Sequence, residues 1–311
     1  MMKLDGMGAF VATAEAGSIS AAARRLGLAK SVVSERLAEL ERGLGMRLIQ
    51  RTTRTLSLTE NGRTLLPRAQ RILREMEEAS AELAARSGTL AGPLRLSAPM
   101  GFGILHLGPA LARFLAEHRE IDLSLELDDR FVDAAAAGYD AVLRHGNVDD
   151  TRLVAHRLAS SRRLLVASPA YVAEHGRPHS LATLAEHRGI LYSNREGDWR
   201  FAGEGGATVI RPKPALRVNN GIVMRDAAVA GLGMALLPSF FVHSSIMSGA
   251  LVPIDIGAHP EGAELFITYA RDHGASAKIQ ALARSLRQSF GEPPYWERGI
   301  GFRPTGAIRP V

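Results

Sequence analysis

The sequence predicts an α/β protein of more than one domain, and three observations support that prediction. Short apolar helices meet at a glycine turn near the N-terminus and precede a basic, threonine-rich segment. A heptad repeat of apolar residues follows. From residue 93 onward, strand-like and helix-like segments alternate, which is typical of sheets with helices on their faces. A chain of 311 residues is long enough for two or three cores.

The positive charge is concentrated near the N-terminus. The whole chain has a formal net charge of +6, whereas residues 18–74 contain 12 Lys and Arg against 4 Glu, a net charge of +8. The remainder is therefore slightly acidic. A basic block beside a near-neutral body is typical of a polyanion-binding module joined to another domain. The alternative is a solvated basic surface.

Composition excludes several classes of protein. The chain is 46% hydrophobic and 23% charged, as ordinary globular proteins are. It has no cysteine, which excludes disulfides and thiolate chemistry and fits the cytoplasm. The N-terminus does not resemble a signal peptide, and we expect no membrane span because no stretch of about 18 uncharged apolar residues occurs.

Two helices are predicted at the N-terminus. Apolar residues recur at helical spacing over residues 4–14, and Gly17 ends that helix. Ser20 is a candidate N-cap for a short second helix, because its hydroxyl can accept from amides of the first turn. Gly27 can take the left-handed conformation that ends it.

A third, longer helix follows, for which Ser31 is a candidate cap and which Gly43 and Gly45 end. Its apolar stripe consists of Val33, Leu37, Leu40 and Leu44. Helix, short helix, tight turn and longer helix is the helix-turn-helix arrangement.

The exposed face at the start of the third helix is the predicted reading surface for DNA bases. Lys30 could donate to guanine, Glu35 could accept from cytosine, and Ser31 and Ser34 could contact a base or a phosphate. For each, the alternative is a solvated helix residue or a cap. The candidate DNA-contacting residues of the helices are Ser20, Lys30, Ser31, Ser34, Glu35 and Arg36.

Two short strands with a basic tip are predicted next. The strands are indicated by Leu48, Ile49, Leu56 and Leu58. Hydroxyl side chains at a tip suit phosphates, and guanidinium groups suit a minor groove. We therefore predict a wing that contacts DNA, the alternative being a solubilising hairpin. Its candidate residues are Arg51, Thr52, Thr53 and Arg54.

A heptad repeat after the wing predicts a helix with an apolar seam for a partner helix. The repeat consists of Leu65, Ala69, Ile72, Met76, Ala79 and Leu83. The alternative is a helix packed on its own chain. Pro67 is expected to bend this helix or to interrupt it for one turn. Residues 87–93 are the predicted hinge to the next part.

Alternation of strands and helices over the rest of the chain predicts a mainly parallel sheet, divided into two lobes because about 200 residues are many for one such sheet. Predicted strands cover residues 94–98, 123–127, 141–144, 164–168, 189–193, 216–219, 234–238 and 265–270. Predicted helices cover residues 107–118, 132–138, 180–187, 223–231 and 276–290. The tail, residues 291–311, lacks periodicity and is predicted to be extended, with Tyr295 and Trp296 as candidates for packing on the body.

The N-terminal residues resemble the DNA-binding end of LysR-type transcriptional regulators. The matching positions are 20–27, Val33, Ser34, Leu37, Leu40, Glu41, Leu44, Gly45, Leu48 and 58–62. The sequence departs from the family pattern at residues 29–32, where Ser-Gln-Pro-Ala is usual, and at Glu35, where a basic residue is usual. Both departures lie on the predicted base-reading face, so they concern the DNA sequence that is read. The resemblance implies that the heptad seam pairs subunits on a palindromic site.

The C-terminal part resembles the effector-binding domain of the same family, which is itself similar to periplasmic solute-binding proteins. Residues 94–103, 139–144 and 230–238 carry the resemblance. It implies an effector bound between two lobes. The predicted domains are a winged helix-turn-helix (1–60), a dimerisation helix (61–88), an effector-binding domain (89–292) and an extended tail (293–311). Within the third, lobe I is about 93–163 and 269–292, and lobe II about 164–268.

Strand ends that would face the cleft supply the candidate effector-binding residues. Amides after the first strand could hold a carboxylate, and Arg144 could pair with an anion, so an organic acid is one candidate effector. The alternatives are an interlobe or surface ion pair for Arg144 and a helix cap for Asn219 and Asn220. The candidates are Pro99, Met100, Gly101, Phe102, Asp128 with its neighbour Asp129, Arg144, Asn219, Asn220 and Gly221.

We find no motif for catalysis, a metal or a cofactor. The ten histidines are scattered without an HExxH pattern, Gly231 and Gly233 lack the later glycine of a dinucleotide fingerprint, and neither GxxxxGK[ST] nor GxSxG occurs. The sequence thus predicts a cytoplasmic, sequence-specific transcriptional regulator that is no enzyme. Its expected partners are double-stranded promoter DNA, a small-molecule effector and its own copies in a homodimer or homotetramer, with RNA polymerase a further candidate. The alternative is a solute-binding protein without a DNA function.

Overall fold

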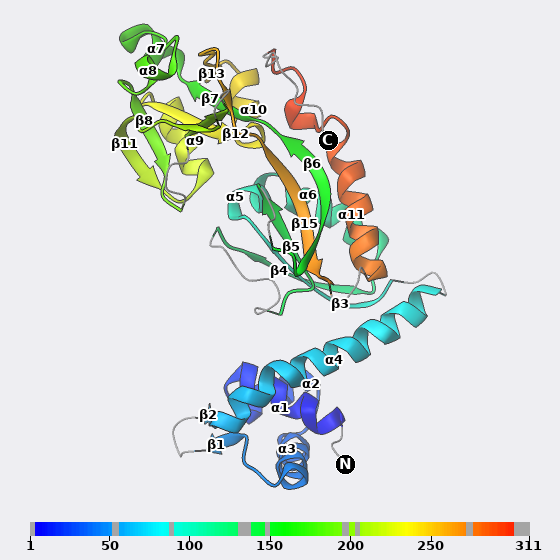
Figure 1. Cartoon of the computed structure of the whole chain (residues 1–311). Coiled ribbons are helices and arrows are strands. Elements are labelled where there is room, and N and C mark those ends of the chain that lie inside the picture. Colours follow the sequence, from blue (N-terminus) through cyan, green and yellow to red (C-terminus); the bar gives the residue numbers. More distant parts are fainter. Residues whose placement is uncertain are drawn as a thin grey trace. The chain divides into compact units, whose positions relative to one another are not determined.

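A computed structural model describes residues 4–51, 56–86, 90–129, 138–146, 150–194, 199–202, 206–271 and 276–301 (Figure 1). The chain divides into two compact units, Met1–Gly92 and Pro93–Val311. In the described residues, unit 1 is helical with one hairpin, and unit 2 contains two five-stranded sheets with helices around them. The predicted α/β class is confirmed.

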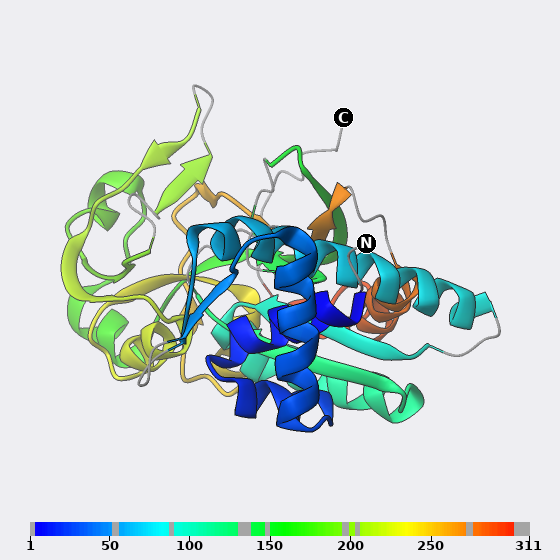
Figure 2. The same cartoon turned by 90° about the horizontal axis from the view of Figure 1, so that it is seen from below.

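Unit 1 begins with three helices, α1 (Leu4–Ala16), α2 (Ile19–Leu26) and α3 (Lys30–Leu44). The hairpin of β1 (Ile49–Arg51) and β2 (Leu56–Leu58) follows, and then the long helix α4 (Glu60–Arg86) (Figure 2). Alanines of α1 and α2 and Val33 of α3 form one small cluster. A second cluster joins α1, α3, the hairpin and α4 around Phe10 and Leu37. Both helices of the helix-turn-helix are thus fixed by α1.

The predicted serine caps are displaced in the structure. Ser18 caps α2, since its extended backbone lets its hydroxyl accept from Ala21 N at 3.1 Å, and Ser20 lies inside the helix. The N-cap of α3 is Ala29, which has no side-chain acceptor, so Ser31 is a helix residue. Gly27 and Gly45 end their helices as predicted, with φ of 63° and 68°, where a side chain would be strained. Gly43 lies inside α3, so its prediction as a helix end is wrong.

Helix α4 runs without a break through Pro67, so the predicted loss of one turn does not occur. Proline removes one main-chain hydrogen bond from a helix interior. Leu65 and Ala69, on either side of Pro67, pack into the core of unit 1. This packing holds the helix together where the bond is missing.

Unit 2 has a first lobe, lobe I, built on the sheet order β4-β3-β5-β15-β6. Its strands are β3 (Gly92–Ala98), β4 (Ile121–Leu127), β5 (Ala141–His145), β6 (Leu153–Ser161) and β15 (Ala263–Ala270). Its helical segments are α5 (Met100–Phe102), η1 (Gly103–Leu107), α6 (Gly108–Glu117) and α11 (Ala277–Phe290). The backbone is helical through both junctions between α5 and α6.

Lobe II is built on the order β11-β8-β12-β7-β13. Its strands are β7 (Arg163–Ala167), β8 (Arg188–Tyr192), β11 (Lys213–Val218), β12 (Met234–Pro238) and β13 (Val252–Pro253). Its helices are α7 (Pro169–His175), α8 (Leu181–Leu184), α9 (Gly221–Val229) and α10 (Ser239–Met247). A small sheet adds β9 (Arg200–Ala202), β10 (Thr208–Val209) and β14 (His259–Pro260).

The two large sheets are mixed, so the prediction of a mainly parallel sheet is wrong. Strands β3 and β5 pair in parallel, as do β8 with β11 and β12, but β15 is antiparallel to β5 and β6, and β7 to β12 and β13. The chain leaves lobe I through β6 into β7 and returns through β15. Of these crossing strands, β15 runs against β5 and β6 in lobe I, and β7 runs against β12 and β13 in lobe II. The return strand begins at Ala263, earlier than the predicted boundary at 269. The predicted helix 132–138 lies outside the described residues up to position 137.

The segment after α11 is folded onto both lobes, so the prediction of an extended tail is wrong for residues 291–301, which we call the C-terminal strap. It contains the short helix η3 (Tyr295–Glu297). Trp296 is 0% exposed and donates from Nε1 to the main-chain oxygen of Ser160 at 3.1 Å. The predicted packing of Tyr295 and Trp296 is confirmed. Residues 302–311 lie outside the described part.

Polar and apolar contacts fix the strap where the chain crosses between lobes. The Glu297 carboxylate accepts from Arg162 N at 2.8 Å and from Ser239 Oγ at 2.5 Å, and it pairs with the Arg162 guanidinium. Ile300 lies in the core of lobe II. The strap therefore adds a connection between α11 of lobe I and the body of lobe II.

His106 of η1 is buried beside the strap. Its Nε2 donates to the Phe240 carbonyl at 3.0 Å, so Nδ1 accepts from the Tyr295 hydroxyl at 2.5 Å. Burial lowers the pKa of His106 from 6.5 to about 4, against the Phe240 hydrogen bond, which raises it. The imidazole is therefore neutral in the folded protein.

A pH dependence follows from His106. Because the unfolded chain binds this proton at higher pH than the folded chain does, the free energy of unfolding falls as pH drops below 6.5 and levels off below about 4. Between pH 7 and pH 5 we expect unit 2 to lose about 2 kcal/mol through this group. Tryptophan fluorescence in urea measures it, since Trp199 and Trp296 both lie in unit 2. His106→Asn should flatten the profile, and an equally steep profile in that variant would contradict the assignment.

Candidate functional site

The start of α3 presents most of the predicted base-reading residues. Val33 and Leu37 are buried against α1 and α2, so the opposite side of the helix is turned outward. Lys30, Ser31 and Glu35 are exposed, and Ser34 is half-buried. Ser20 is exposed on α2. An N-terminal helix turn with these donors and acceptors is suited to base edges and phosphates.

Arg36 differs from the other candidates on α3. Its guanidinium forms an ion pair with Asp5 of α1 at 3.2 Å, and about a third of the side chain is exposed. A phosphate would therefore have to compete with Asp5 for Arg36. Among the helix candidates, Lys30 is the cation for which we expect the more direct role.

Glu41 connects α3 to the hairpin, a role that the sequence pattern did not indicate. Its buried carboxylate accepts through Oε1 from Leu48 N at 2.8 Å and Ile49 N at 3.1 Å, and through Oε2 from Arg47 at 3.3 Å. The two amides belong to residues of the unit core. The available signal was an acidic residue directly after the apolar stripe position Leu40.

The predicted hairpin is present, and hydrogen bonds define the end at which it joins α4. Ile49 pairs with Leu58 and Arg51 with Leu56. Thr59 Oγ1 donates to the Arg47 carbonyl at 2.8 Å and accepts from Gly62 N at 3.0 Å, which joins β2 to the first turn of α4. Thr52, Thr53, Arg54 and the side chain of Arg51 lie outside the described residues, so the tip contacts stay predictions.

The heptad seam on α4 divides into two halves. Ala69 is fully buried, and Leu65 and Ile72 pack on the same core as Phe10 of α1. This half therefore follows the alternative of packing on its own chain. Met76 is 44% exposed and Ala79 is exposed. The side chain of Leu83 lies outside the described residues, so the seam for a partner subunit is reduced to the second half of the helix.

The division of the seam leads to a testable difference. Met76→Lys should weaken dimerisation and leave the fold of unit 1 intact, because the Met76 side chain is 44% exposed. Replacing one apolar seam residue by a charge should raise the dimer dissociation constant about tenfold or more. Light scattering over a concentration series measures it. Ala69→Lys is the comparison, since it should unfold unit 1 instead. A Met76→Lys protein that dimerises as the wild type does would remove Met76 from the interface.

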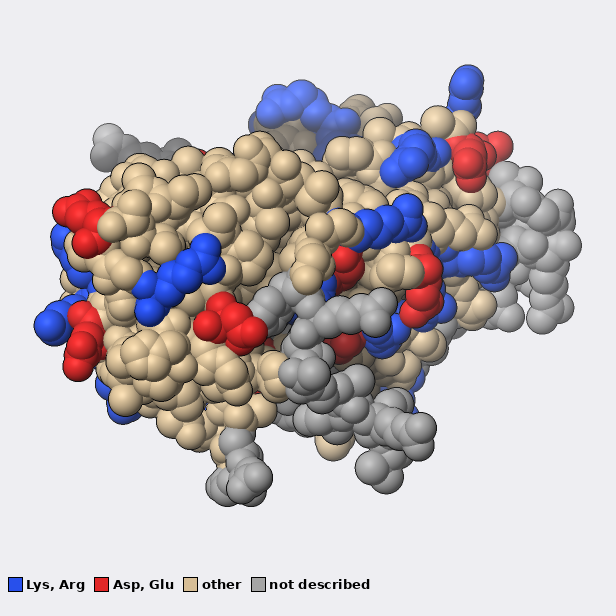
Figure 3. Space-filling view, turned by 90° about the horizontal axis from the view of Figure 1, so that it is seen from above, with Lys and Arg blue, Asp and Glu red and all other residues tan. Residues whose placement is uncertain are grey.

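Positively charged side chains are unevenly distributed along the chain. On the face shown in Figure 3, Lys and Arg are interspersed with Asp and Glu around a wide area without charged side chains. This face does not form a continuous basic surface. The excess of positive charge lies in residues 18–74, which form α2, α3, the hairpin and much of α4.

Strand ends of both lobes meet around Asp129, which follows β4. Its Oδ1 accepts from Met100 N at 2.9 Å, and its Oδ2 accepts from Asn220 Nδ2 at 3.3 Å. Its main-chain oxygen accepts from Asn194 Nδ2 at 3.2 Å. Met100 begins the helical run of lobe I, and Asn220 precedes α9 of lobe II. The structure thus brings Met100 and Asn220 together, as predicted for a site between the lobes.

Asn220 also caps α9. Its Oδ1 accepts from Ile222 N at 3.0 Å and from Val223 N at 3.2 Å. The cap considered as an alternative is therefore present, and the same side chain contacts Asp129 of lobe I. Asn219 beside it is exposed.

Phe241 of α10 packs between the two glycine candidates. A methyl group built on Gly101 of lobe I or on Gly221 of lobe II would overlap the Phe241 ring. The glycines therefore let an aromatic ring of lobe II reach the start of the lobe I helix. Sequence patterns alone did not indicate Phe241 or Asn194, because both contact the site from other elements.

The remaining effector-binding candidates differ in how far their side chains are exposed. Phe102 is fully buried among Phe240, Phe290 and Trp296, so its side chain is removed from the ligand-contacting set. Pro99, Asp128 and Arg144 are half-buried at the ends of their strands. These three stay candidates.

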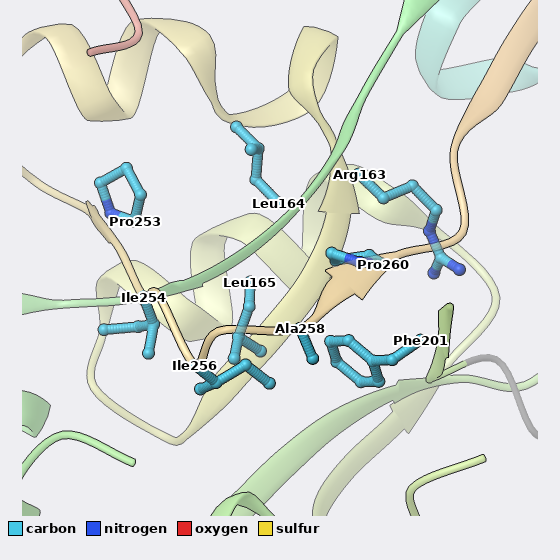
Figure 4. A pocket seen from close by; sticks show the side chains of 9 residues that line it. All are labelled: Arg163, Leu164, Leu165, Phe201, Pro253, Ile254, Ile256, Ala258 and Pro260. Atoms are coloured by element: carbon cyan, nitrogen blue, oxygen red, sulfur yellow. The ribbon is translucent and has the colours of Figure 1, made fainter. Parts of the chain in front are cut away.

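A separate hollow of about 270 Å³, which includes open solvent, lies in lobe II (Figure 4). It is lined by Arg163, Leu164, Leu165, Phe201, Pro253, Ile254, Ile256, Ala258 and Pro260. None of these belongs to the interlobe set. Arg163 is buried and donates to the Leu236 carbonyl at 3.2 Å.

The described residues contain no group of three or more His, Asp or Glu side chains arranged to hold a metal ion. In the same part of the chain, no helix is both long enough and apolar enough to span a membrane.

Two protein families match the chain. The family described as "Bacterial regulatory helix-turn-helix protein, lysR family" matches residues 4–63, from α1 into α4. The family described as "LysR substrate binding domain" matches residues 87–291, which span both lobes to the end of α11.

Named proteins similar to this chain are regulators. The HTH-type transcriptional regulator CrgA of Neisseria meningitidis serogroup C is 36% identical over 289 residues, 91% of this chain and 95% of CrgA. The HTH-type transcriptional regulator PtxR of Pseudomonas aeruginosa is 32% identical over 297 residues, 94% of this chain and 95% of PtxR. A solved structure of CrgA from Neisseria meningitidis, described as a LysR-type transcriptional regulator, has a TM-score of 0.59 at 31% identity, covering 94% of this chain and 100% of that one.

Proposed function

The chain belongs to the LysR family of transcriptional regulators, and we propose that it reads promoter DNA through the start of α3 and the hairpin tip. The observation that carries this proposal is the exposed first turn of α3, with Lys30, Ser31 and Glu35 opposite a buried stripe. Glu41 supports it, because its contacts hold the hairpin in a defined place beside α3. The expected DNA contacts at the tip are Arg51, Thr52, Thr53 and Arg54.

The family pairs this reading unit with a domain that binds a small molecule. We place the effector between the lobes of unit 2, where Met100, Asn220 and the half-buried Pro99, Asp128 and Arg144 are the expected contacts. An effector alters DNA contact only if it binds two arrangements of the protein with different affinity. An organic acid fits the donors at Met100 N and Asn220 Nδ2.

The same proposal covers assembly. Met76, Ala79 and Leu83 would pair two copies along the second half of α4, so that two reading heads face a palindromic promoter site. We propose a homodimer or homotetramer that acts in the cytoplasm, with RNA polymerase as a further partner and no enzymatic activity. A solute-binding protein without a DNA function is not favoured, because residues 4–63 match the helix-turn-helix family.

Fluorescence anisotropy tests the DNA function. We expect the full-length protein to bind the intergenic duplex upstream of its own gene more tightly than a scrambled duplex, with strong salt dependence. Arg54→Ala should weaken binding to both duplexes and lower the salt slope by about one. Glu35→Ala should instead change the preferred sequence. Unchanged affinity of Arg54→Ala at moderate salt would contradict the wing assignment, and equal weak binding to genomic fragments of any sequence would contradict a specific reader.

A further inference from the structure

Asp129 connects the lobes through its own carboxylate. The two oxygens are held by different lobes: Met100 N of lobe I donates to Oδ1, and Asn220 Nδ2 of lobe II donates to Oδ2. Asn194 of lobe II holds the main-chain oxygen of the same residue. Of these residues, Met100 and Asn220 are the donors expected to serve an effector. A side chain of the protein therefore uses the hydrogen bonds that a ligand carboxylate would use.

Both donors are positioned independently of Asp129. The Met100 amide belongs to the first turn of a helical run, where main-chain N–H groups lack helical acceptors. The Asn220 carboxamide is oriented by its cap of Ile222 N and Val223 N. Gly101 and Gly221, the next residues along the chain, rest on the Phe241 ring. If the Asp129 carboxylate left, both donors would stay in place and would need another acceptor.

A ligand carboxylate could replace the Asp129 carboxylate in its hydrogen bonds. Its donors are a main-chain amide and a carboxamide, both neutral. Among the described residues, no Lys or Arg forms an ion pair with Asp129. The side chain is half-buried rather than enclosed. A free carboxylate could form the same two hydrogen bonds without separating an ion pair.

We propose that Asp129 is a built-in competitor of a carboxylate effector. The inference rests on the proposed function, because it concerns the effector site between the lobes. A carboxylate ligand that takes Met100 N and Asn220 Nδ2 has to displace the Asp129 side chain, and this breaks the hydrogen bond by which Asp129 of lobe I holds Asn220. The direct hydrogen bond between the lobes is then replaced by one through the ligand, so a ligand that fits one arrangement of the lobes better than another binds the two with different affinity, as regulation requires. Asp129 is thus a specificity-determining and positioning residue.

Chemical rescue by acetate tests this proposal in the full-length protein. Asp129→Ala removes the internal carboxylate, so hydrogen exchange of peptides that contain Met100 should become about tenfold faster or more. Acetate, titrated against chloride at matched ionic strength, should restore the protection in Asp129→Ala and have little effect on the wild type. Asp122→Ala is the matched control, because Asp122 is an exposed carboxylate on β4. Peptides that contain Ile222 and Val223 should be unchanged, since Asn220 still caps them.

The outcomes separate the two proposals. The competitor role is wrong if Asp129→Ala exchanges at Met100 as the wild type does, or if acetate protects no better than chloride. If Asp129→Ala does not fold, Asp129→Asn replaces it: the shape is kept, and acetate should protect it more than it protects the wild type. DNA anisotropy of the same samples judges only the proposed function, because α3 and the hairpin belong to unit 1.

Discussion

Glu41→Ala should abolish specific DNA binding while unit 2 stays folded. The substitution leaves the buried amides of Leu48 and Ile49 without their acceptor, and each such group costs about 1–3 kcal/mol. We therefore expect unit 1 to lose about 3 kcal/mol of unfolding free energy. The hairpin would also lose its attachment to α3, so that the tip and the recognition helix no longer meet DNA together.

Anisotropy on the specific duplex measures the loss of binding, and circular dichroism at the helical band follows unit 1. The tryptophans give an internal control, because both belong to unit 2 and their emission should not change. Glu41→Gln keeps one oxygen acceptor in the same place, so it should retain most of the stability. DNA affinity equal to that of the wild type in Glu41→Ala would show that the hairpin is held by its strand pairing and apolar contacts alone.

Of the substitutions predicted for unit 2, Trp296→Ala should lower the free energy of unfolding most. The ring is fully buried against Phe102, Phe240 and Phe290, and Nε1 donates to Ser160. Truncating a buried Trp to Ala costs about 3–5 kcal/mol through lost contacts and a cavity. Because the strap contacts both lobes, the loss should also loosen the crossing between β6 and β7.

Urea unfolding of Trp296→Ala can be followed through Trp199 of lobe II, which stays in the variant. Trp296→Phe fills part of the cavity and loses mainly the hydrogen bond to Ser160, so it should be destabilised less. DNA binding at low temperature should be kept by both variants. Wild-type stability in Trp296→Ala would mean that the strap rests on the lobes without supporting them.

Most of unit 1 could be predicted from the sequence because its signals are local. Gly27 and Gly45 end their helices in the left-handed conformation that glycine favours, and the stripe of α3 is buried as its spacing predicts. The serine caps are harder to predict from the sequence. Ser18 and Ser20 are two residues apart with the same side chain, and only the backbone angles of Ser18 decide which one caps α2.

The heptad repeat on α4 shows the limit of a periodic pattern. Its spacing correctly predicts one apolar face along a helix, yet it does not say what covers that face. In the structure α1 and its neighbours cover Leu65, Ala69 and Ile72, and leave Met76 exposed. Which seam residues are covered depends on how far α1 and its neighbours extend along α4, and no residue of α4 determines that.

Sequence patterns therefore defined the family, the helix-turn-helix, most strands of unit 2 and the strand ends where a site would lie. The folded chain added the contacts between distant residues. Asp129 meets Asn220 across 91 positions, and Trp296 meets Ser160 across 136. Helix caps and apolar periods arise from neighbours within a few residues. Hydrogen bonds between the lobes depend on how whole sheets pack against each other. The contacts of Asp129, Phe241 and the C-terminal strap can therefore be recognised only in the folded structure.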